Sequence, residues 1–93
     1  MGTQNTATIN FGSTPIDEKD FVITDANLSG LTFAEAWFMG SDSTGDNDAT
    51  AHKMAAALMR PVCDSPSGSN MNIHVDVLGG LVTGQFMIRY AAN

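Results

Sequence analysis

Residues 70–77 read Asn-Met-Asn-Ile-His-Val-Asp-Val, a strict alternation of polar and apolar side chains. In an extended strand successive side chains point to opposite faces, so this stretch has one apolar face and one polar face. The apolar face comprises Met71, Ile73, Val75 and Val77, and the polar face comprises Asn70, Asn72, His74 and Asp76. The pattern predicts a β-strand that is buried on one side.

A second alternating run follows at residues 85–90, where Phe86, Ile88 and Tyr90 lie opposite Gln85, Met87 and Arg89. The connector Leu78–Gly84 between the two runs is rich in glycine. Two period-2 runs joined in this way predict a β-hairpin with one buried face. An isolated hairpin is only marginally stable in water, so the rest of the chain must supply strands that pack on that face.

Three further stretches have strand-like patterns: Thr6–Phe11, Phe21–Thr24 and Leu31–Met39. The third has apolar residues on both faces, with Trp37 on one face and Phe38 on the other. This predicts a central strand that is covered on both sides.

The stretch from Asp48 to Arg60 is ambiguous. Asn47 or Asp48 is a suitable N-cap, and the many alanines that follow favour a helix, which Pro61 would end. Against a long helix, Leu58, Arg60 and Val62 alternate as a strand would. We therefore expect a short helical turn from about Asp48 to Lys53 and an extended segment to Cys63, with a full helix up to Met59 as the alternative.

These patterns predict an all-β protein: a small antiparallel β-sandwich or barrel-like fold of five to six strands, with one short helix at most around residues 48–59. The 93 residues are enough for one domain. We expect residues 1–5 to form a flexible N-terminal arm and residues 6–93 to form the β domain.

The charge balance excludes one class of function. Ten acidic and four scattered basic residues give a net charge of −6, whereas a nucleic-acid-binding protein needs a basic surface. No apolar run approaches a membrane span and no leader pattern opens the chain, so we expect a soluble product made in the cytoplasm.

Two groups of residues invite a metal interpretation. Asp42, Asp46 and Asp48 supply oxygen ligands of the kind that calcium prefers, although their spacing matches no EF-hand. His52, His74 and Cys63 are zinc-type ligands without zinc-type spacing. We therefore expect a solvated acidic loop at Ser41–Asp48, no metal and no cofactor. The sequence has no nucleophile elbow or phosphate loop, which argues against an enzyme.

Four residues are candidates for contacts with other chains. Trp37 and Met87 are of types that are enriched in interfaces, and the alternation places Met87 on a polar face. His74 and Arg89 lie on the polar faces of their strands, where they would be available to a neighbouring subunit.

Several segments resemble small structural proteins of tailed bacteriophages. The similar stretches are Ala7–Gly12, Phe21–Ala26, Glu35–Met39, Asp42–His52 and Gly84–Tyr90. Members of that family carry a charged Asp-Glu-His loop where this chain has Asp48-Ala49-Thr50-Ala51-His52, without the glutamate, so no role is assigned to that loop.

The resemblance implies a non-enzymatic virion component that forms homo-oligomers, with a trimer as one arrangement. The preferred role is a capsid decoration or cement protein that contacts the major capsid protein, and the alternative is a tail fibre or tail adaptor component. From another class, the chain could be a carbohydrate-binding module that uses an exposed Trp37, or a soluble phage inhibitor of a host protein. Neither nucleic acid nor membrane is an expected partner.

Overall fold

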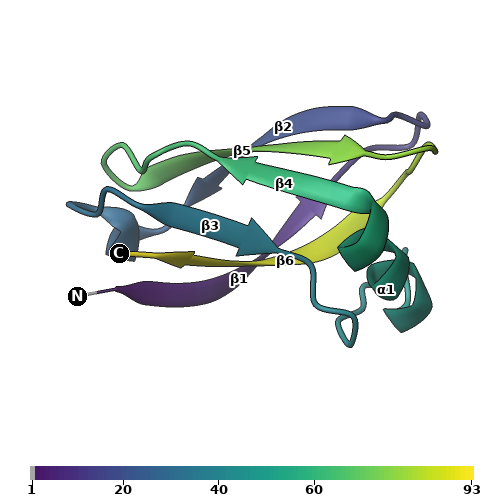
Figure 1. The fold of residues 1–93 in the computed structure, drawn as a ribbon, viewed down its shortest axis with the longest axis horizontal. Helices are drawn as coiled ribbons and strands as arrows, with labels where there is room; N and C mark the ends of the chain where they lie inside the picture. Colours follow the sequence, from purple (N-terminus) through teal and green to yellow (C-terminus); the bar gives the residue numbers. More distant parts are fainter. Residues whose placement is uncertain (1) are drawn as a thin grey trace.

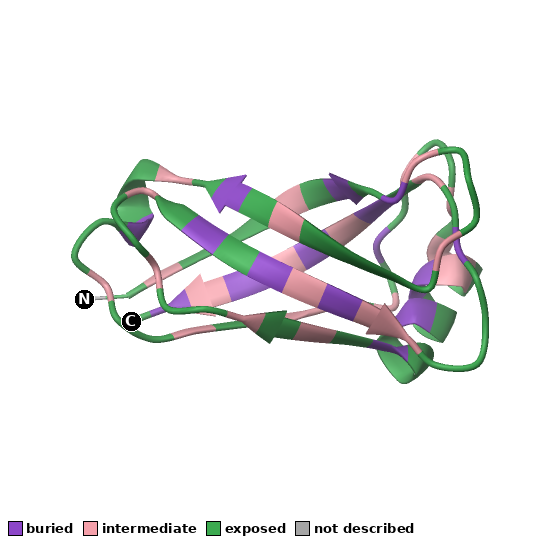
Figure 2. Cartoon of the chain, turned by 90° about the horizontal axis from the view of Figure 1, so that it is seen from above, coloured by how far each residue is buried: buried purple, intermediate pink, exposed green. Residues whose placement is uncertain are grey.

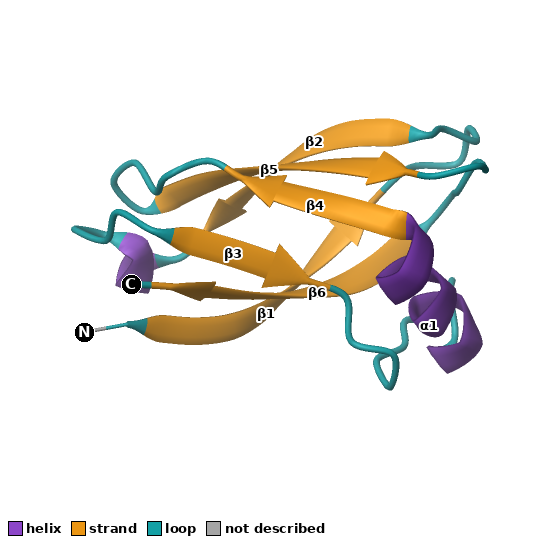
Figure 3. Cartoon of the chain, in the orientation of Figure 1, coloured by secondary structure: helices purple, strands orange, loops and turns teal. Residues whose placement is uncertain are grey.

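The computed structural model describes residues 2–93 as a β-sandwich of two three-stranded antiparallel sheets (Figure 1). One sheet has the strand order β1-β6-β3 and the other has the order β2-β5-β4. One α-helix lies at one end of the sandwich, and both chain termini lie at the other end (Figures 1 and 3). The elements in chain order are β1 (Thr3–Asn10), β2 (Glu18–Thr24), the 3-10 helix η1 (Ala26–Leu28), β3 (Ala34–Trp37), α1 (Ala49–Leu58), β4 (Met59–Cys63), β5 (Asn70–Val77) and β6 (Gln85–Ala92).

The two alternating runs are the central strands of the two sheets. Both strands and their buried faces were predicted correctly, since Ile73 and Val75 of β5 and Phe86 and Ile88 of β6 are all buried. The predicted hairpin is wrong, because β5 pairs with β2 and β4 while β6 pairs with β1 and β3. The connector Leu78–Gly84 therefore passes from one sheet to the other.

The core lies between the two sheets, and buried residues alternate with exposed ones along the strands (Figure 2). Phe86, near the start of β6, makes edge-to-face contacts with the rings of Phe11 and Phe38. Near the other end of β6, the hydroxyl of buried Tyr90 donates to Asp25 Oδ2 at 2.6 Å. Burial, and then this hydrogen bond to Asp25, raise the pKa of Tyr90 to about 12.

Two strand boundaries differ from the predictions. β1 begins at Thr3, so Thr3–Asn5 of the expected arm pair with β6, and Met1 lies outside the described residues. The predicted central strand Leu31–Met39 is wrong, since β3 covers only Ala34–Trp37 and forms the edge of its sheet. Phe33 is 65% exposed, which is consistent with a position beyond the covered part of the sheet.

The ambiguous stretch contains both elements that its pattern suggested. Asp48 caps α1 as predicted, and its side chain accepts a hydrogen bond from the Ala51 N–H at 2.9 Å. The helix continues to Leu58 and not only to Lys53, in accordance with the helix propensity of its alanines. β4 follows without a loop, and it tolerates Pro61 because it is an edge strand. Within residues 2–93, α1 and η1 are too short to cross a membrane.

The fold predicts that substitutions at inner positions of the strands lower the stability more than substitutions at outer positions. Ile88 is completely buried in the central strand β6, so Ile88→Ala should lower the free energy of unfolding by about 2–5 kcal/mol. Val22→Ala is the matched control, because Val22 is 63% exposed, and it should change stability by no more than about 0.5 kcal/mol. Urea denaturation followed by circular dichroism measures both, and equal effects would contradict this assignment of faces.

Candidate functional site

Three of the four predicted interface residues share the outer face of the β1-β6-β3 sheet. Met87 and Arg89 are alternate residues of β6, and Trp37 on β3 is the register partner of Arg89. All three are half-buried. His74 lies on the outer face of the opposite sheet, so the four residues do not form one surface.

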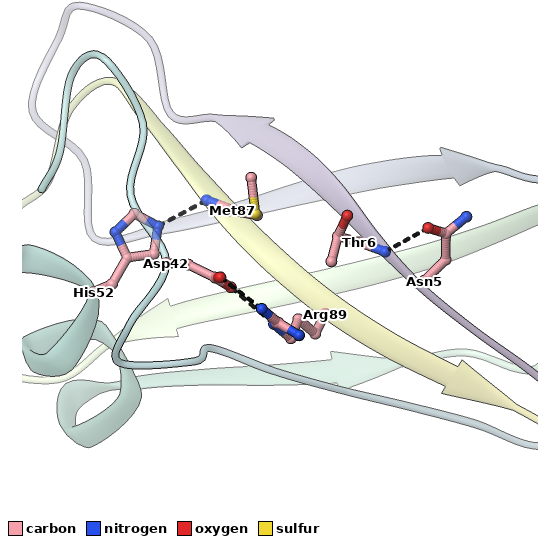
Figure 4. A network of polar contacts seen from close by, with 6 residues as sticks. All are labelled: Asn5, Thr6, Asp42, His52, Met87 and Arg89. Carbon is pink, nitrogen blue, oxygen red and sulfur yellow. Dashed lines mark hydrogen bonds and ion pairs between the residues drawn. The ribbon is translucent and has the colours of Figure 1, made fainter. Parts of the chain in front are cut away.

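Arg89 is held by its own chain. Its Nε and Nη2 atoms donate to the two carboxylate oxygens of Asp42 at 3.0 and 2.8 Å (Figure 4). Asp42 is buried, and the hydrogen bonds from Arg89 hold its pKa below the usual range. This bidentate pair fixes the loop before α1 on the outer face of β6.

The same loop completes the hydrogen bonding of β6. β3 pairs only with Arg89–Ala92, so the first half of β6 has a partner strand on one side only. At Gln85 the N–H donates to Asp46 Oδ2 at 2.9 Å, and the C=O accepts from Thr44 Oγ1 at 2.7 Å and from Asn47 Nδ2 at 2.8 Å. Side chains thus replace the missing strand.

His52 of α1 supplies a further hydrogen bond to β6 in place of a strand. Its ring is completely buried, and its Nε2 accepts a hydrogen bond from the Met87 N–H at 2.9 Å (Figure 4). Its Nδ1 lies 3.0 Å from the carbonyl oxygen of Asp48, so the hydrogen-bond network requires the proton on Nδ1. From the sequence, His52 was only a candidate zinc ligand. Its position one helical turn after the N-cap Asp48 is the feature that could have indicated a contact between Nδ1 and the carbonyl oxygen of the cap.

The acidic residues considered for calcium each serve a separate purpose in the fold. Asp42 binds Arg89, Asp46 binds the backbone of Gln85 and Asp48 caps α1. Among residues 2–93 they do not come together as a group at metal-ligand distances. The segment is largely exposed, as predicted for a solvated loop, and it also clamps β6 through these hydrogen bonds.

The residues considered for zinc are also apart. His52 lies inside α1, Cys63 on β4 packs against the core, and His74 faces outward from β5. Burial, followed by the nearby Asp64 and Glu35 carboxylates, raises the pKa of the Cys63 thiol. At neutral pH this free cysteine is therefore predominantly a thiol and a weak nucleophile.

His74 instead lies between two carboxylates. Its Nδ1 is 2.6 Å from Asp20 Oδ1 on β2, and its Nε2 is 2.9 Å from Asp76 Oδ1 on its own strand. These hydrogen bonds, first that of Asp20 and then that of Asp76, raise the pKa of His74. Glu18 lies beside them as the register partner of Asp76.

The four edge strands of the sandwich differ in how they are protected against pairing with another chain. β2 begins with the charged run Glu18-Lys19-Asp20, β4 contains Arg60 and Pro61, and the short β3 lies beside β4. β1 has eight residues, Thr3–Asn10, without charge or proline. Charges, prolines and short lengths are the usual protections of a sheet edge, and β1 has none of them.

The register of β1 with β6 shows which backbone N–H and C=O groups of β1 point away from β6. The Phe11 N–H donates to the Gly84 carbonyl oxygen at 2.9 Å, which extends the pairing toward β6. By alternation the backbone groups of Thr6 and Thr8 point away from β6. The Thr6 N–H is bonded locally to Asn5 Oδ1 at 2.8 Å (Figure 4).

An apolar hollow of about 220 Å³ lies between α1 and the connector that joins the two sheets. Its walls carry no charged side chain, and Met54 and Leu81 on its rim are 51% and 65% exposed. The lining residues are Met54, Ala55, Leu58, Met59, Val77, Leu78, Gly79, Gly80, Leu81 and Val82.

Comparison of the chain with family models, with curated proteins and with solved structures gave no match. The phage resemblance thus stays a prediction from sequence, and function has to be argued from the surfaces described above.

The role of His52 predicts a local effect as well as a global one. His52→Leu removes the acceptor of the buried Met87 N–H, which should lower the free energy of unfolding by about 1–3 kcal/mol. The Met87 amide should also exchange with solvent faster relative to the Ile88 amide. Met54→Ala, on the exposed side of the same helix, is the control and should leave Met87 exchange unchanged. Unchanged Met87 protection in His52→Leu would contradict the proposed hydrogen bond.

The Asp42–Arg89 pair predicts a dependence of stability on pH. The folded state lowers the pKa of Asp42 from its ordinary value of 3.8, so the stabilisation is fully present above that value and is lost as the pH falls through the folded-state pKa. Asp42→Asn should therefore be less stable than the wild type at neutral pH, and the difference should shrink on acidification. Thermal melts across the acid range measure it, with the exposed Asp64→Asn as control. A constant difference at all pH values would refute the linkage.

Proposed function

We propose that this chain is a non-enzymatic structural protein that associates with copies of itself through the free edge of β1. The observation that carries the proposal is the eight-residue edge without charge or proline, in a sandwich whose other edges are short, charged or interrupted. A free edge offers a row of outward N–H and C=O groups to another strand, and at β1 the Thr6 N–H would exchange its local bond to Asn5 Oδ1 for a bond to that strand.

A second copy is the partner that fits this edge. Two β1 strands related by a two-fold axis pair antiparallel and need no charge complementarity. With a net charge of −6, contacts between acidic parts of the surfaces of two copies are repulsive. The β1 edge and the apolar hollow beside α1 are free of charge, so they can meet a like-charged copy without this cost.

Edge pairing alone gives a dimer. The apolar hollow beside α1, lined by Leu58, Leu78 and Leu81 among others, would supply a second contact in a larger assembly. The side chains that might have carried chemistry are used to hold the fold, as the hydrogen bonds of Asp42, Asp46 and His52 to β6 indicate. These observations favour assembly over catalysis.

The more specific proposal is a capsid decoration or cement protein of a tailed bacteriophage, with the major capsid protein as its partner. Its support is the resemblance of the sequence segments, and a small β-sandwich with an edge for self-association suits a virion lattice. A tail fibre or tail adaptor component is the alternative within this class.

The test compares wild-type protein with the double variant Thr6→Lys/Thr8→Lys. Both residues are exposed near the middle of β1, where each introduced charge would meet its counterpart in a two-fold pair. We expect the wild type to be a dimer or larger by light scattering and the variant to be a monomer. Val22→Lys, at an exposed position of the already charged strand β2, should stay oligomeric.

Circular dichroism and thermal melts establish that the variants remain folded. A wild type that is monomeric at every soluble concentration, or a double variant with unchanged mass, would refute assembly through β1. For the virion role, mass spectrometry of gradient-purified particles should find the chain in many copies. Its absence from particles would favour the soluble inhibitor instead.

A further inference from the structure

The outer face of the β2-β5-β4 sheet carries a cluster of metal-ligating side chains that the assembly proposal does not use. The register pairs Glu18 with Asp76 and Asp20 with His74, so two alternate pairs of the β2–β5 ladder bring all four residues to one face. Ligand atoms of Glu18, His74 and Asp76 lie within 4.8 Å of one another. The β-ladder holds the Cα atoms of these residues in a fixed arrangement.

The imidazole ring of His74 is oriented by Asp20. Because Asp20 Oδ1 lies 2.6 Å from Nδ1, a proton on Nδ1 is directed to Asp20, and Nε2 is left facing Asp76. A carboxylate that accepts the second ring N–H is the usual outer partner of a metal-ligating histidine, since it fixes the tautomer and increases the basicity of the other nitrogen. The side chain of His74 is 37% exposed, so the ring is in contact with solvent.

We propose that Glu18, His74 and Asp76 form a binding site for a divalent transition-metal ion, with Zn²⁺ as the best fit, and that Asp20 is its positioning residue. Imidazole nitrogen and carboxylate oxygen are both zinc ligand types, and three such ligands with a water in the fourth position complete a tetrahedral zinc site. Calcium and magnesium favour ligand sets made only of oxygen, and the histidine therefore selects against them.

Metal binding requires movement of side chains, since the ligand atoms of Glu18, His74 and Asp76 now lie within 4.8 Å of one another. Tetrahedral zinc ligands at ordinary bond lengths are about 3.4 Å apart. The distance from His74 Nε2 to Asp76 Oδ1 is 2.9 Å, so the Asp76 side chain has to withdraw by only a few tenths of an ångström. Binding would replace the proton on Nε2 by the metal. Arg60, the register partner of Asp76, is the cationic strand residue that faces this cluster. With Arg60 included, the site still has a net negative charge.

The experiment is a titration of ZnCl₂ into tag-free, metal-free protein, followed by calorimetry and by NMR of the His74 ring. We expect saturable binding of one ion per chain, a shift of the His74 ring signals and a higher melting temperature. His74→Ala should abolish this binding. Asp20→Ala, which removes no ligand, should weaken it by about 10–100-fold. Excess CaCl₂ should not displace the zinc.

Glu35→Gln is the matched control, since it removes one exposed carboxylate from the other sheet and should leave the affinity unchanged. Absence of saturable zinc binding by the wild type would overturn the proposal, as would equal affinity in wild type and His74→Ala. Unchanged affinity in Asp20→Ala would overturn the positioning role. The site is independent of β1, so Thr6→Lys/Thr8→Lys should bind zinc like the wild type, whether or not the assembly proposal holds.

Discussion

The fold depends on satisfying the backbone of β6, the central strand of one sheet. A buried N–H or C=O group without a partner costs free energy, and a central strand has such groups on both sides. β1 covers one side along the whole length of β6, but β3 covers the other side only from Arg89 to Ala92. The uncovered groups of exposed Gln85 and half-buried Met87 are bonded instead by side chains from residues 44–52.

This constraint explains why α1 sits at the end of the sandwich. His52 can reach Met87 only if the first turn of the helix lies against β6, and the Asp48 cap starts the helix at that place. The Asp42–Arg89 pair holds the preceding loop on the same strand. The loop, the helix cap and the buried histidine therefore act together, and β4 follows directly from the anchored helix into the opposite sheet.

The sequence predicted the β class and the two central strands with their buried faces because alternation is a local signal. The hairpin prediction failed because a glycine-rich connector between two alternating runs has the same local pattern in two cases. It can join two paired strands, or it can pass from one sheet to the other. The connector is in fact anchored elsewhere, since Val82 bridges to Ile16 and the Leu78 N–H donates to Leu58. Those partners are far away in the sequence, and no local pattern reveals them.

Side-chain clusters were predicted less well than strands for the same reason. Asp42 and Asp46 were predicted to lie in a solvated acidic loop, and Asp46 is exposed, but composition could not show that both carboxylates also bond to β6. The cluster around His74 comes from β2 and β5, and the pairing of Asp20 with His74 depends on a register that the sequence does not encode locally. The His74-x-Asp76 spacing was visible, but it gained meaning only when Glu18 and Asp20 were placed opposite.

The two proposed activities use different parts of the sandwich, which makes them physically compatible. The free edge of β1 belongs to one sheet, and the cluster of Glu18, His74 and Asp76 lies on the outer face of the other. Association through β1 extends the first sheet sideways and leaves the second face open to solvent. A metal bound there would tie β2 to β5, since its ligands come from both strands. It would therefore stiffen an edge strand of the second sheet without altering the surface through which copies of the chain meet.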